Sequence, residues 1–335
     1  MKINLRFLQI ICCLQIICLF FSVGVADGKL DSLFQLEKQF STNSWSIGLS
    51  NNENELFVAD GINNKILVFD FNGNPIREFS LTDSDTCKGH IHGIAIFEKR
   101  IYSVKENNDC IGIYDLEGKL LKKFGSTGKE FGKFNSPQNI KIFDNMIYIT
   151  DNKNKRIQVF DIEGNFIFYF DIQKSELKND FGTPYDLEIY QGKIYVTLPK
   201  QNNIQIFDLK GNFINNLKIS SDVIDPLGIT IDNDRIFLTS GDANQILILN
   251  LKGEIVDTIK SDFFDPHQIV IFKNKMYVLD TRNFLVKIFN IPETYDNNYE
   301  NNYQNSVDNN INFILLIAVI ITAMYLIKRY HTKRK

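Results

Sequence analysis

Three of the four histidines in this 335-residue chain, His90, His92 and His267, lie in segments rich in Ile, Val and Phe. Imidazole is a common ligand for zinc, so these residues are the first candidates for chemistry. His92 and His267 occupy equivalent positions, because each stands two residues before an isoleucine within an apolar run. We therefore expect these two histidines to come together at one place in the fold.

A repeated turn signature supplies the framework that would position them. Asp or Asn, followed by two residues and then usually Gly, closes each of six similar segments, at Asp70, Asp115, Asp161, Asp208, Asn250 and Asn290. The steps between these positions are 45, 46, 47, 42 and 40 residues. Self-similarity at this period is typical of radial repeats, in which each unit buries its apolar faces against its neighbours.

Each unit contains three short runs of Ile, Val, Phe and Tyr, separated by Asn, Asp, Gly and Lys, a pattern that predicts strands and turns. In the third unit the runs are residues 139–143, 146–150 and 156–160. A fourth run follows the turn in five units but is missing from the sixth, and residues 33–40 supply a spare one. We therefore predict an all-β, six-bladed β-propeller over residues 27–292, closed by its N-terminal strand.

The candidate residues then fall at one end of the central channel. In an up-and-down blade, the connection into the first strand and the loop between the second and third strands lie at the same end. The residue two places before the first-strand isoleucine, and the residue after it, therefore ring the channel mouth. Radial folds bind ligands there, so we predict a ligand site that includes Trp45, His92, Gln138, Asn139, Tyr185, Asp186 and His267.

Two cysteines map to this same end of the second blade. Cys87 lies in the connection into the blade, and Cys110 ends the loop between its second and third strands. The other three cysteines belong to the N-terminal apolar segment. An even pair in an exported domain predicts a Cys87–Cys110 disulfide.

The third unit resembles the NHL repeat. The resemblance rests on FGSTG, a proline before the first strand, IYITD, NKRIQVFD and EGNF, and it extends over about residues 33–292. NHL proteins are six-bladed propellers, so the resemblance implies the same blade number as the period. The single tryptophan excludes repeats built on a tryptophan signature.

Two further resemblances suggest enzymes. The PHQIV segment around His267 is similar to a zinc-ligating segment of peptide-amidating lyase propellers, which use three histidines from alternate blades. This resemblance implies that His92 and His267 ligate zinc, although Tyr185 stands at the third position. Asn139 and Asp186 resemble the calcium ligands of gluconolactonase-like propellers, although Ser46 replaces the expected glutamate. Zn or Ca at the channel mouth is therefore one expectation.

The ends of the chain predict a membrane protein. Residues 1–26 have the basic start, apolar centre and small-residue end of a signal peptide. Residues 293–310 form a polar stalk, residues 311–327 are an apolar segment that could span a membrane, and residues 328–335 are basic. This layout places the propeller outside the cell and the C-terminus in the cytoplasm, as a single-pass protein. Removal of the last segment as a sorting signal is the alternative.

Charge and location together narrow the function. The formal net charge is −3 overall, but the exported part is more acidic because both apolar ends carry basic residues. An acidic extracellular surface does not suit nucleic acid. We predict a membrane-anchored module that binds a protein, peptide or glycan through the loop face. The alternative is an exported metal-dependent lyase or hydrolase with its site at the channel mouth.

Overall fold

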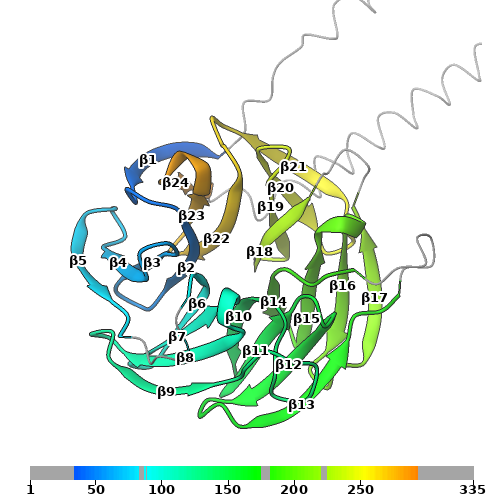
Figure 1. The fold of residues 1–335 in the computed structure, drawn as a ribbon. Coiled ribbons are helices and arrows are strands. Elements are labelled where there is room, and N and C mark those ends of the chain that lie inside the picture. The colour runs from blue at the N-terminus through cyan, green and yellow to red at the C-terminus, as the bar shows by residue number, and fades with distance from the viewer. Residues whose placement is uncertain (1–33, 83–86, 88, 175–181, 220–224, 293–335) are drawn as a thin grey trace, which may run out of the picture. The chain divides into compact units, whose positions relative to one another are not determined.

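The computed structural model describes residues 34–82, 87, 89–174, 182–219 and 225–292, which form a six-bladed β-propeller (Figure 1). Each blade is a four-stranded antiparallel sheet whose first strand lies innermost. Blade 1 contains β2 (Ser46–Asn51), β3 (Leu56–Asp60), β4 (Lys65–Phe69) and β5 (Pro75–Ser80). Blade 2 contains β6 (Ile91–Phe97), β7 (Arg100–Lys105), β8 (Cys110–Asp115) and β9 (Leu120–Phe124). Blade 3 contains β10 (Pro137–Phe143), β11 (Met146–Asp151), β12 (Arg156–Asp161) and β13 (Phe166–Asp171).

The remaining blades follow the same plan. Blade 4 contains β14 (Leu187–Tyr190), β15 (Lys193–Leu198), β16 (Asn203–Asp208) and β17 (Phe213–Lys218). Blade 5 contains β18 (Pro226–Asp232), β19 (Arg235–Ser240), β20 (Gln245–Asn250) and β21 (Ile255–Lys260). Blade 6 contains β22 (Pro266–Phe272), β23 (Lys275–Asp280), β24 (Leu285–Asn290) and the N-terminal β1 (Gln35–Ser41). The predicted all-β, six-bladed fold is confirmed.

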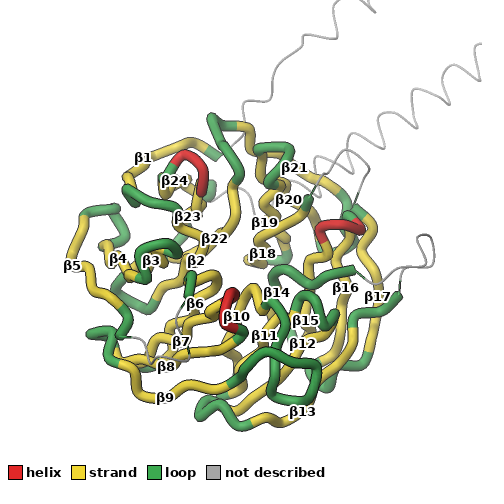
Figure 2. Tube along the Cα trace, viewed as in Figure 1, coloured by secondary structure: helices red, strands yellow, loops and turns green. Residues whose placement is uncertain are grey.

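Three 3-10 helices follow the second strand of alternate blades, drawn in red in Figure 2. They are η1 (Glu106–Asn108) in blade 2, η2 (Pro199–Gln201) in blade 4 and η3 (Thr281–Asn283) in blade 6. In each, the residue after the helix is left-handed and donates its N–H back to the first helical carbonyl. These tight turns lie at the end of the blades where the innermost strands begin, so they border the channel mouth.

The N-terminal strand closes the ring, as the sequence predicts. β1 pairs antiparallel with β24, from Gln35 opposite Asn290 to Ser41 opposite Leu285. Phe40 of β1 also reaches blade 1, where its ring centroid lies 4.4 Å from that of Phe69. β1 therefore completes blade 6 and packs on blade 1 at the same time.

The recurring turn explains why the repeat is visible in the sequence. In blade 3, Asp161 Oδ1 accepts hydrogen bonds from the backbone N–H groups of Glu163 and Asn165, both at 2.9 Å. Gly164 follows with φ +76°, a conformation that favours glycine. The ring of Phe124, at the end of the blade 2 outer strand, lies where a Gly164 side chain would stand. The turn thus shapes its own blade and receives an aromatic residue from the preceding one.

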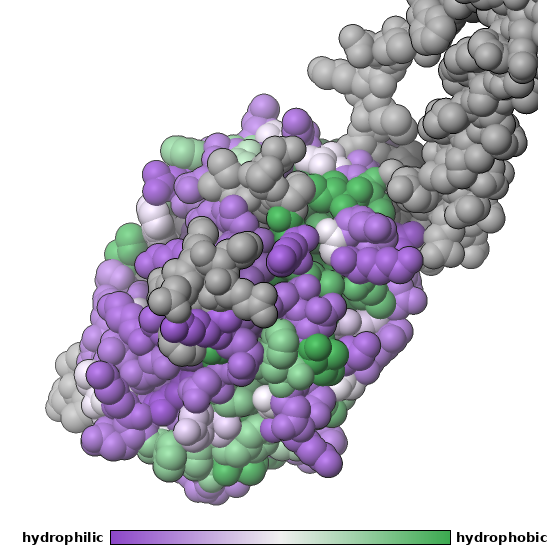
Figure 3. All heavy atoms as spheres, turned by 90° about the vertical axis from the view of Figure 1, so that its right-hand side faces the viewer, coloured by the Kyte–Doolittle hydropathy of each residue, from purple (hydrophilic) through white to green (hydrophobic). Residues whose placement is uncertain are grey.

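The hydrophobic core consists of six apolar clusters, one between each pair of neighbouring blades. Tyrosines of the second strands add hydrogen bonds between blades: Tyr102 donates to the carbonyl of Ile162 at 3.2 Å, and Tyr277 to that of Phe71 at 3.0 Å. Figure 3 shows one side of the molecule, where hydrophilic residues surround separate apolar patches. Because packing lies between blades, the positions of the innermost strands are fixed by their neighbours on both sides.

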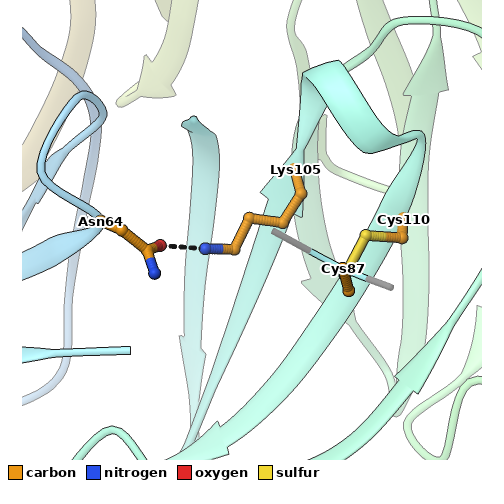
Figure 4. The surroundings of a disulfide bond; sticks show 4 residues. All are labelled: Asn64, Cys87, Lys105 and Cys110. Carbon is orange, nitrogen blue, oxygen red and sulfur yellow. Dashed lines mark hydrogen bonds between the residues drawn. A yellow bond between two sulfur atoms is a disulfide. The ribbon is translucent and has the colours of Figure 1, made fainter. Parts of the chain in front are cut away.

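The predicted disulfide is present between Cys87 and Cys110, with Cα atoms 5.9 Å apart (Figure 4). Both cysteines are buried. Beside it, Lys105 at the end of β7 donates a hydrogen bond to Asn64 of blade 1. The disulfide ties the connection into blade 2, which contains Cys87, to Cys110 at the start of β8.

The predicted signal peptide, stalk, membrane segment and basic tail lie outside the described residues. Among the residues that are described, no helix is long and apolar enough to span a membrane.

Candidate functional site

An irregularity at the start of the innermost strands turns side chains into the channel mouth. In β6, Ile91 pairs with Lys105 and Ile94 with Ser103, so His92 and Gly93 lie in a bulge. In β22 the bulge holds His267 and Gln268, because the paired residues are Pro266 and Ile269. β-Bulges re-aim side chains and are frequent next to functional sites. The bulge explains how strand residues of several blades can point toward one axis.

Three side chains, from His92, Tyr185 and His267, meet across the mouth. The Tyr185 hydroxyl lies 2.8 Å from His267 Nδ1, and the two ring centroids are 6.0 Å apart. The His92 ring packs edge-on against Tyr185, with centroids 5.7 Å apart. These residues come from blades 2, 4 and 6, which is the alternation expected from the sequence positions.

Asp265 extends this contact away from the axis. His267 Nε2 lies 3.3 Å from Asp265 Oδ1, while Arg282 Nε lies 2.9 Å from Asp265 Oδ2. The hydrogen bond with His267, followed by the Arg282 charge, holds the pKa of the Asp265 carboxyl below its ordinary value despite partial burial. The result is a continuous chain from carboxylate to imidazole to phenol, Asp265–His267–Tyr185.

His92 is held in a different state. Its Nδ1 lies 3.0 Å from the Gln138 carbonyl oxygen, which can only accept, so Nδ1 carries the proton. Burial, together with repulsion from His267, lowers the pKa of His92 from 6.5 to about 4, against an opposing effect of the Glu106 charge. His92 is therefore neutral at pH 7, and the lone pair lies on Nε2.

Tyr185 has the opposite shift. Burial and the nearby carboxylates of Asp186 and Asp265 raise the pKa of its phenol well above 10. The phenol therefore keeps its proton at neutral pH. A neutral imidazole and a protonated phenol in ring contact form a pair in which one group can accept a proton and the other can donate one.

Glu106, in η1, was not predicted from the sequence. Its Oε1 accepts hydrogen bonds from Ser136 Oγ at 2.7 Å and Gln138 Nε2 at 3.0 Å. Burial acts to raise the pKa of Glu106, but the Ser136 hydrogen bond and the neighbouring His92 outweigh it, and the pKa is lowered. Glu106 thus ties the predicted mouth residue Gln138 to blade 2.

Threonine hydroxyls fix the backbone that carries the mouth residues. Thr150 Oγ1 donates to the Tyr185 carbonyl at 3.0 Å, and Thr239 Oγ1 donates to the His267 carbonyl at 2.8 Å. Each threonine belongs to the second strand of the preceding blade. The positions of Tyr185 and His267 are therefore set by their neighbours as well as by their own strands.

Asn139 and Asp186 lie deeper in the channel and contact each other. Asn139 Nδ2 donates to Asp186 Oδ1, and Asp186 Oδ2 accepts from the Ile229 N–H at 3.0 Å. Burial raises the pKa of Asp186 to about 6, although the Lys141 charge acts to lower it. The two side chains also line a channel cavity of about 190 Å³. Their hydrogen bonds join blades 3, 4 and 5.

Trp45 is displaced from the position that the sequence suggests. In blade 1, Leu49 pairs with Val58, and the matching pair in blade 2 is Ile94 with Ser103. The counterpart of His92 in blade 1 is therefore Ile47, two residues after Trp45. Trp45 lies in the connection from β1 to β2 and lines a separate cup with Ile47, Gly61, Ile62 and His90.

The geometry of a metal site differs from the expected one. Both nitrogens of His267 contact protein groups, Tyr185 on one side and Asp265 on the other. Asn139 and Asp186 are bonded to each other. Within the part of the chain that the structure describes, no three His, Cys, Asp or Glu side chains form a group that could hold a metal ion. A metal bound by His92 and His267 stays a prediction.

Comparison with known proteins relates the chain to propeller lyases at the level of fold. No protein-family model matches the sequence, and no curated protein matches it. A streptogramin B lyase structure is 18% identical, with a TM-score of 0.56 over 77% of this chain and 88% of that one. Virginiamycin B lyase from Staphylococcus aureus is 17% identical, with a TM-score of 0.55 over 76% and 88%. A catalytically inactive histidine-to-alanine variant of that lyase, with quinupristin, is 18% identical, with a TM-score of 0.55 over 78% and 90%.

Proposed function

We propose that the channel mouth is a proton-transfer site and that the protein is a lyase that performs an elimination. The observation that carries this proposal is the Asp265–His267–Tyr185 chain with neutral His92 packed against the phenol. Elimination needs one group that removes a proton from carbon and another that gives a proton to the leaving group. Two groups whose pKa values are shifted apart are suited to these roles.

His92 is the base in this scheme. Its Nε2 takes the proton from the carbon next to a carbonyl, and the electrons of that C–H bond form the new double bond. The bond to the leaving group breaks, and the leaving group takes the proton of Tyr185. Transfer of the proton from His92 to Tyr185, whose rings are in contact, restores both groups. His267, held in place by Asp265, orients the phenol through its contact with the Tyr185 hydroxyl.

Elimination fits this site better than nucleophilic catalysis. In the described ranges, no serine or cysteine side chain is hydrogen-bonded to His92 or His267, whose partners are Gln138, Tyr185 and Asp265. An activated nucleophile requires such a contact. The reaction also needs neither water nor a second substrate.

The similar structures support this choice. They are lyases with the same fold, and one is a catalytically inactive variant in which alanine replaces a histidine. At this level of identity the likeness concerns the fold, so the residue roles rest on the geometry of this chain.

Turnover of defined esters tests the proposal. The probes are N-acetyl-O-acetyl-serine amide, which has an acidic α proton and a carboxylate leaving group, and quinupristin. We expect an unsaturated product, and we expect Tyr185→Phe to lower turnover by about 10²-fold or more. Tyr190→Phe is the matched control, because the Tyr190 hydroxyl bonds Asp234 on the surface. Equal turnover by the two tyrosine variants would contradict the proposal.

A chelator separates direct proton transfer from metal chemistry. If EDTA abolishes turnover and added zinc restores it, His92 and His267 act as metal ligands, as the sequence resemblance implies. Restoration by calcium alone would instead implicate Asn139 and Asp186. If turnover persists in EDTA, the histidines transfer protons directly.

A binding module for a protein, peptide or glycan is the second candidate function, and the half-buried Trp45 in the cup beside the channel mouth favours it. An exposed aromatic edge combines apolar area with hydrogen bonding. Loss of partner capture in Trp45→Ala, with no turnover of any ester by the parent protein, would support this function instead. For either function we propose a cell-surface location, which the disulfide supports because such bonds persist in oxidising compartments.

A further inference from the structure

A small cup lies beside the proton-transfer site. Trp45, Ile47, Gly61, Ile62 and His90 line a cavity of about 260 Å³. Ile62 is 58% exposed, so the cup presents apolar surface to solvent. Gly61 forms part of the cup wall, and a side chain there would meet the Ile91 carbonyl oxygen at 2.8 Å. The wall at Gly61 therefore packs closely on blade 2 and allows no side chain.

The cup is connected to the catalytic chain from two directions. Ile47 is the blade 1 counterpart of His92, and His90 is two residues from His92 along the chain. On the other side, the Arg282 guanidinium lies 5.9 Å from the Trp45 ring centroid and bonds Asp265 through Nε. A ligand in the cup would thus lie beside Arg282, which bonds the Asp265 end of the Asp265–His267–Tyr185 chain.

We propose that this cup is the subsite for an apolar, ring-sized group of the substrate, and that Arg282 binds a carbonyl or carboxylate oxygen next to that group. The proposal rests on the proposed lyase function and names the chemistry of its substrate. The proposal concerns the substrate group attached beside the reacting carbon. Binding of this group in the cup would hold the carbon in place for proton transfer at the mouth.

Size and lining argue for this occupant. A dry apolar cavity of about 150 Å³ holds one benzene ring, so a cup of about 260 Å³ accommodates a phenyl or branched aliphatic group with its attachment. A tryptophan and two isoleucines supply apolar contact area, and an aromatic guest gains further from stacking on Trp45.

The positive charge of Arg282 indicates which substrate atom lies beside the apolar group. Arg282 is half-exposed, and its side-chain hydrogen bond to Asp265 uses Nε alone, so within the described residues its terminal amino groups are available to a ligand. Arginine donates well to oxygen acceptors. Asp265 and Glu106 make the rest of the mouth acidic, so the guanidinium is the point at which a substrate oxygen would bind.

Trp45 makes the test direct, because it is the only tryptophan in the chain. The purified protein is titrated with N-acetyl-L-phenylalanine amide and, separately, with N-acetyl-L-alanine amide, while tryptophan fluorescence is recorded. We expect a saturable change with the first probe and binding at least about tenfold weaker with the second. Equal responses to the two probes, or no response to either, would overturn the proposal.

Variants assign the two halves of the subsite. Ile62→Ala should weaken binding of N-acetyl-L-phenylalanine amide by about threefold or more, because the exposed wall of the cup is lost. Arg282→Gln should weaken binding of N-acetyl-L-phenylalanine, which carries a carboxylate, more than it weakens binding of the corresponding amide. Ile214→Ala, an equally apolar change on the outer strand of blade 4, is the control and should change neither. If Ile62→Ala and Ile214→Ala bind the probe alike, the cup is not the subsite.

A last variant separates this inference from the proposed function. Tyr185→Phe keeps the cup residues unchanged, so it should bind the phenylalanine probe within about twofold of the parent protein. Probe binding at Trp45 without turnover of any ester would leave the subsite standing and refute the lyase. Turnover without a selective fluorescence response at Trp45 would support the lyase and refute the subsite.

Discussion

Replacing Gly73 by alanine tests how the ring is closed. Gly73 belongs to the turn before β5 and has φ +76°. The Phe40 ring of β1 occupies the space that a side chain at position 73 would need. The left-handed conformation costs a residue with a Cβ about 1 kcal/mol, and forcing a methyl group into a packed ring costs about 1–3 kcal/mol more. We therefore expect Gly73→Ala to lower the free energy of unfolding by about 2–4 kcal/mol.

Gly192 provides the matched control. It has φ +71°, but nothing lies within 4 Å of the position that a Cβ would take. Gly192→Ala should therefore show only the backbone cost, about 1 kcal/mol. Urea unfolding followed by Trp45 fluorescence and by circular dichroism measures both variants. If Gly73→Ala is no less stable than Gly192→Ala, Phe40 does not anchor the closing strand.

A double variant checks that the extra cost comes from the contact. Phe40→Ala removes the ring, so adding Gly73→Ala to it should destabilise the protein by only the backbone cost of about 1 kcal/mol. An additive loss in the double variant would show that the two residues act independently.

The remaining predictions concern the site and the disulfide. Neutral His92 contributes stability that is lost as pH falls from 6.5 to about 4, whereas protonated Asp186 contributes stability that is lost as pH rises from 3.8 to about 6. Compared with the parent protein, His92→Gln should lose less stability as pH falls through this range, and Asp186→Asn should lose less stability as pH rises through it. Urea unfolding measures both, and variant profiles parallel to that of the parent protein would refute the assignment. The Cys87–Cys110 bond closes a loop of sequence separation 23, so replacing both cysteines by serine should lower the free energy of unfolding by about 3 kcal/mol. Two free thiols in the non-reduced protein would refute the bond.

The fold follows from the sequence because each unit repeats its own contacts. The Asp161 turn and the Phe124 ring that packs on Gly164 recur from blade to blade, so spacing alone reveals blade number and strand order. The missing fourth strand of the last unit also identifies its replacement, β1. These features are local or involve nearest neighbours, which is why one sequence suffices to predict them.

The site was predicted in part for the same reason. His92, Tyr185 and His267 occupy one repeat position, so their convergence follows from the period. The blade 1 position was misplaced by two residues, although alignment of Gly48 with Gly93 would have identified Ile47.

Asp265, Arg282 and Glu106 could not be found in this way. Glu106 and Arg282 lie in the 3-10 turns η1 and η3, and Asp265 lies in the connection into blade 6 with φ +61°. The conformation of these segments recurs between blades but their residue types differ, so the spacing of the repeat does not single out these side chains. Only the contacts of Asp265 with His267, of Arg282 with Asp265 and of Glu106 with Gln138 reveal that they belong to the site.

The most direct measurement for the proposed function is the mass of the products formed from N-acetyl-O-acetyl-serine amide. Elimination through His92 and Tyr185 predicts acetate and an unsaturated amide whose masses add up to that of the substrate. Hydrolysis would give products that together contain one additional water. Unsaturated product from the parent protein, lost in Tyr185→Phe and kept in Tyr190→Phe, is the result we predict. A water-containing product, or an unsaturated product formed equally by both variants, would contradict the assignment of the channel mouth as an elimination site.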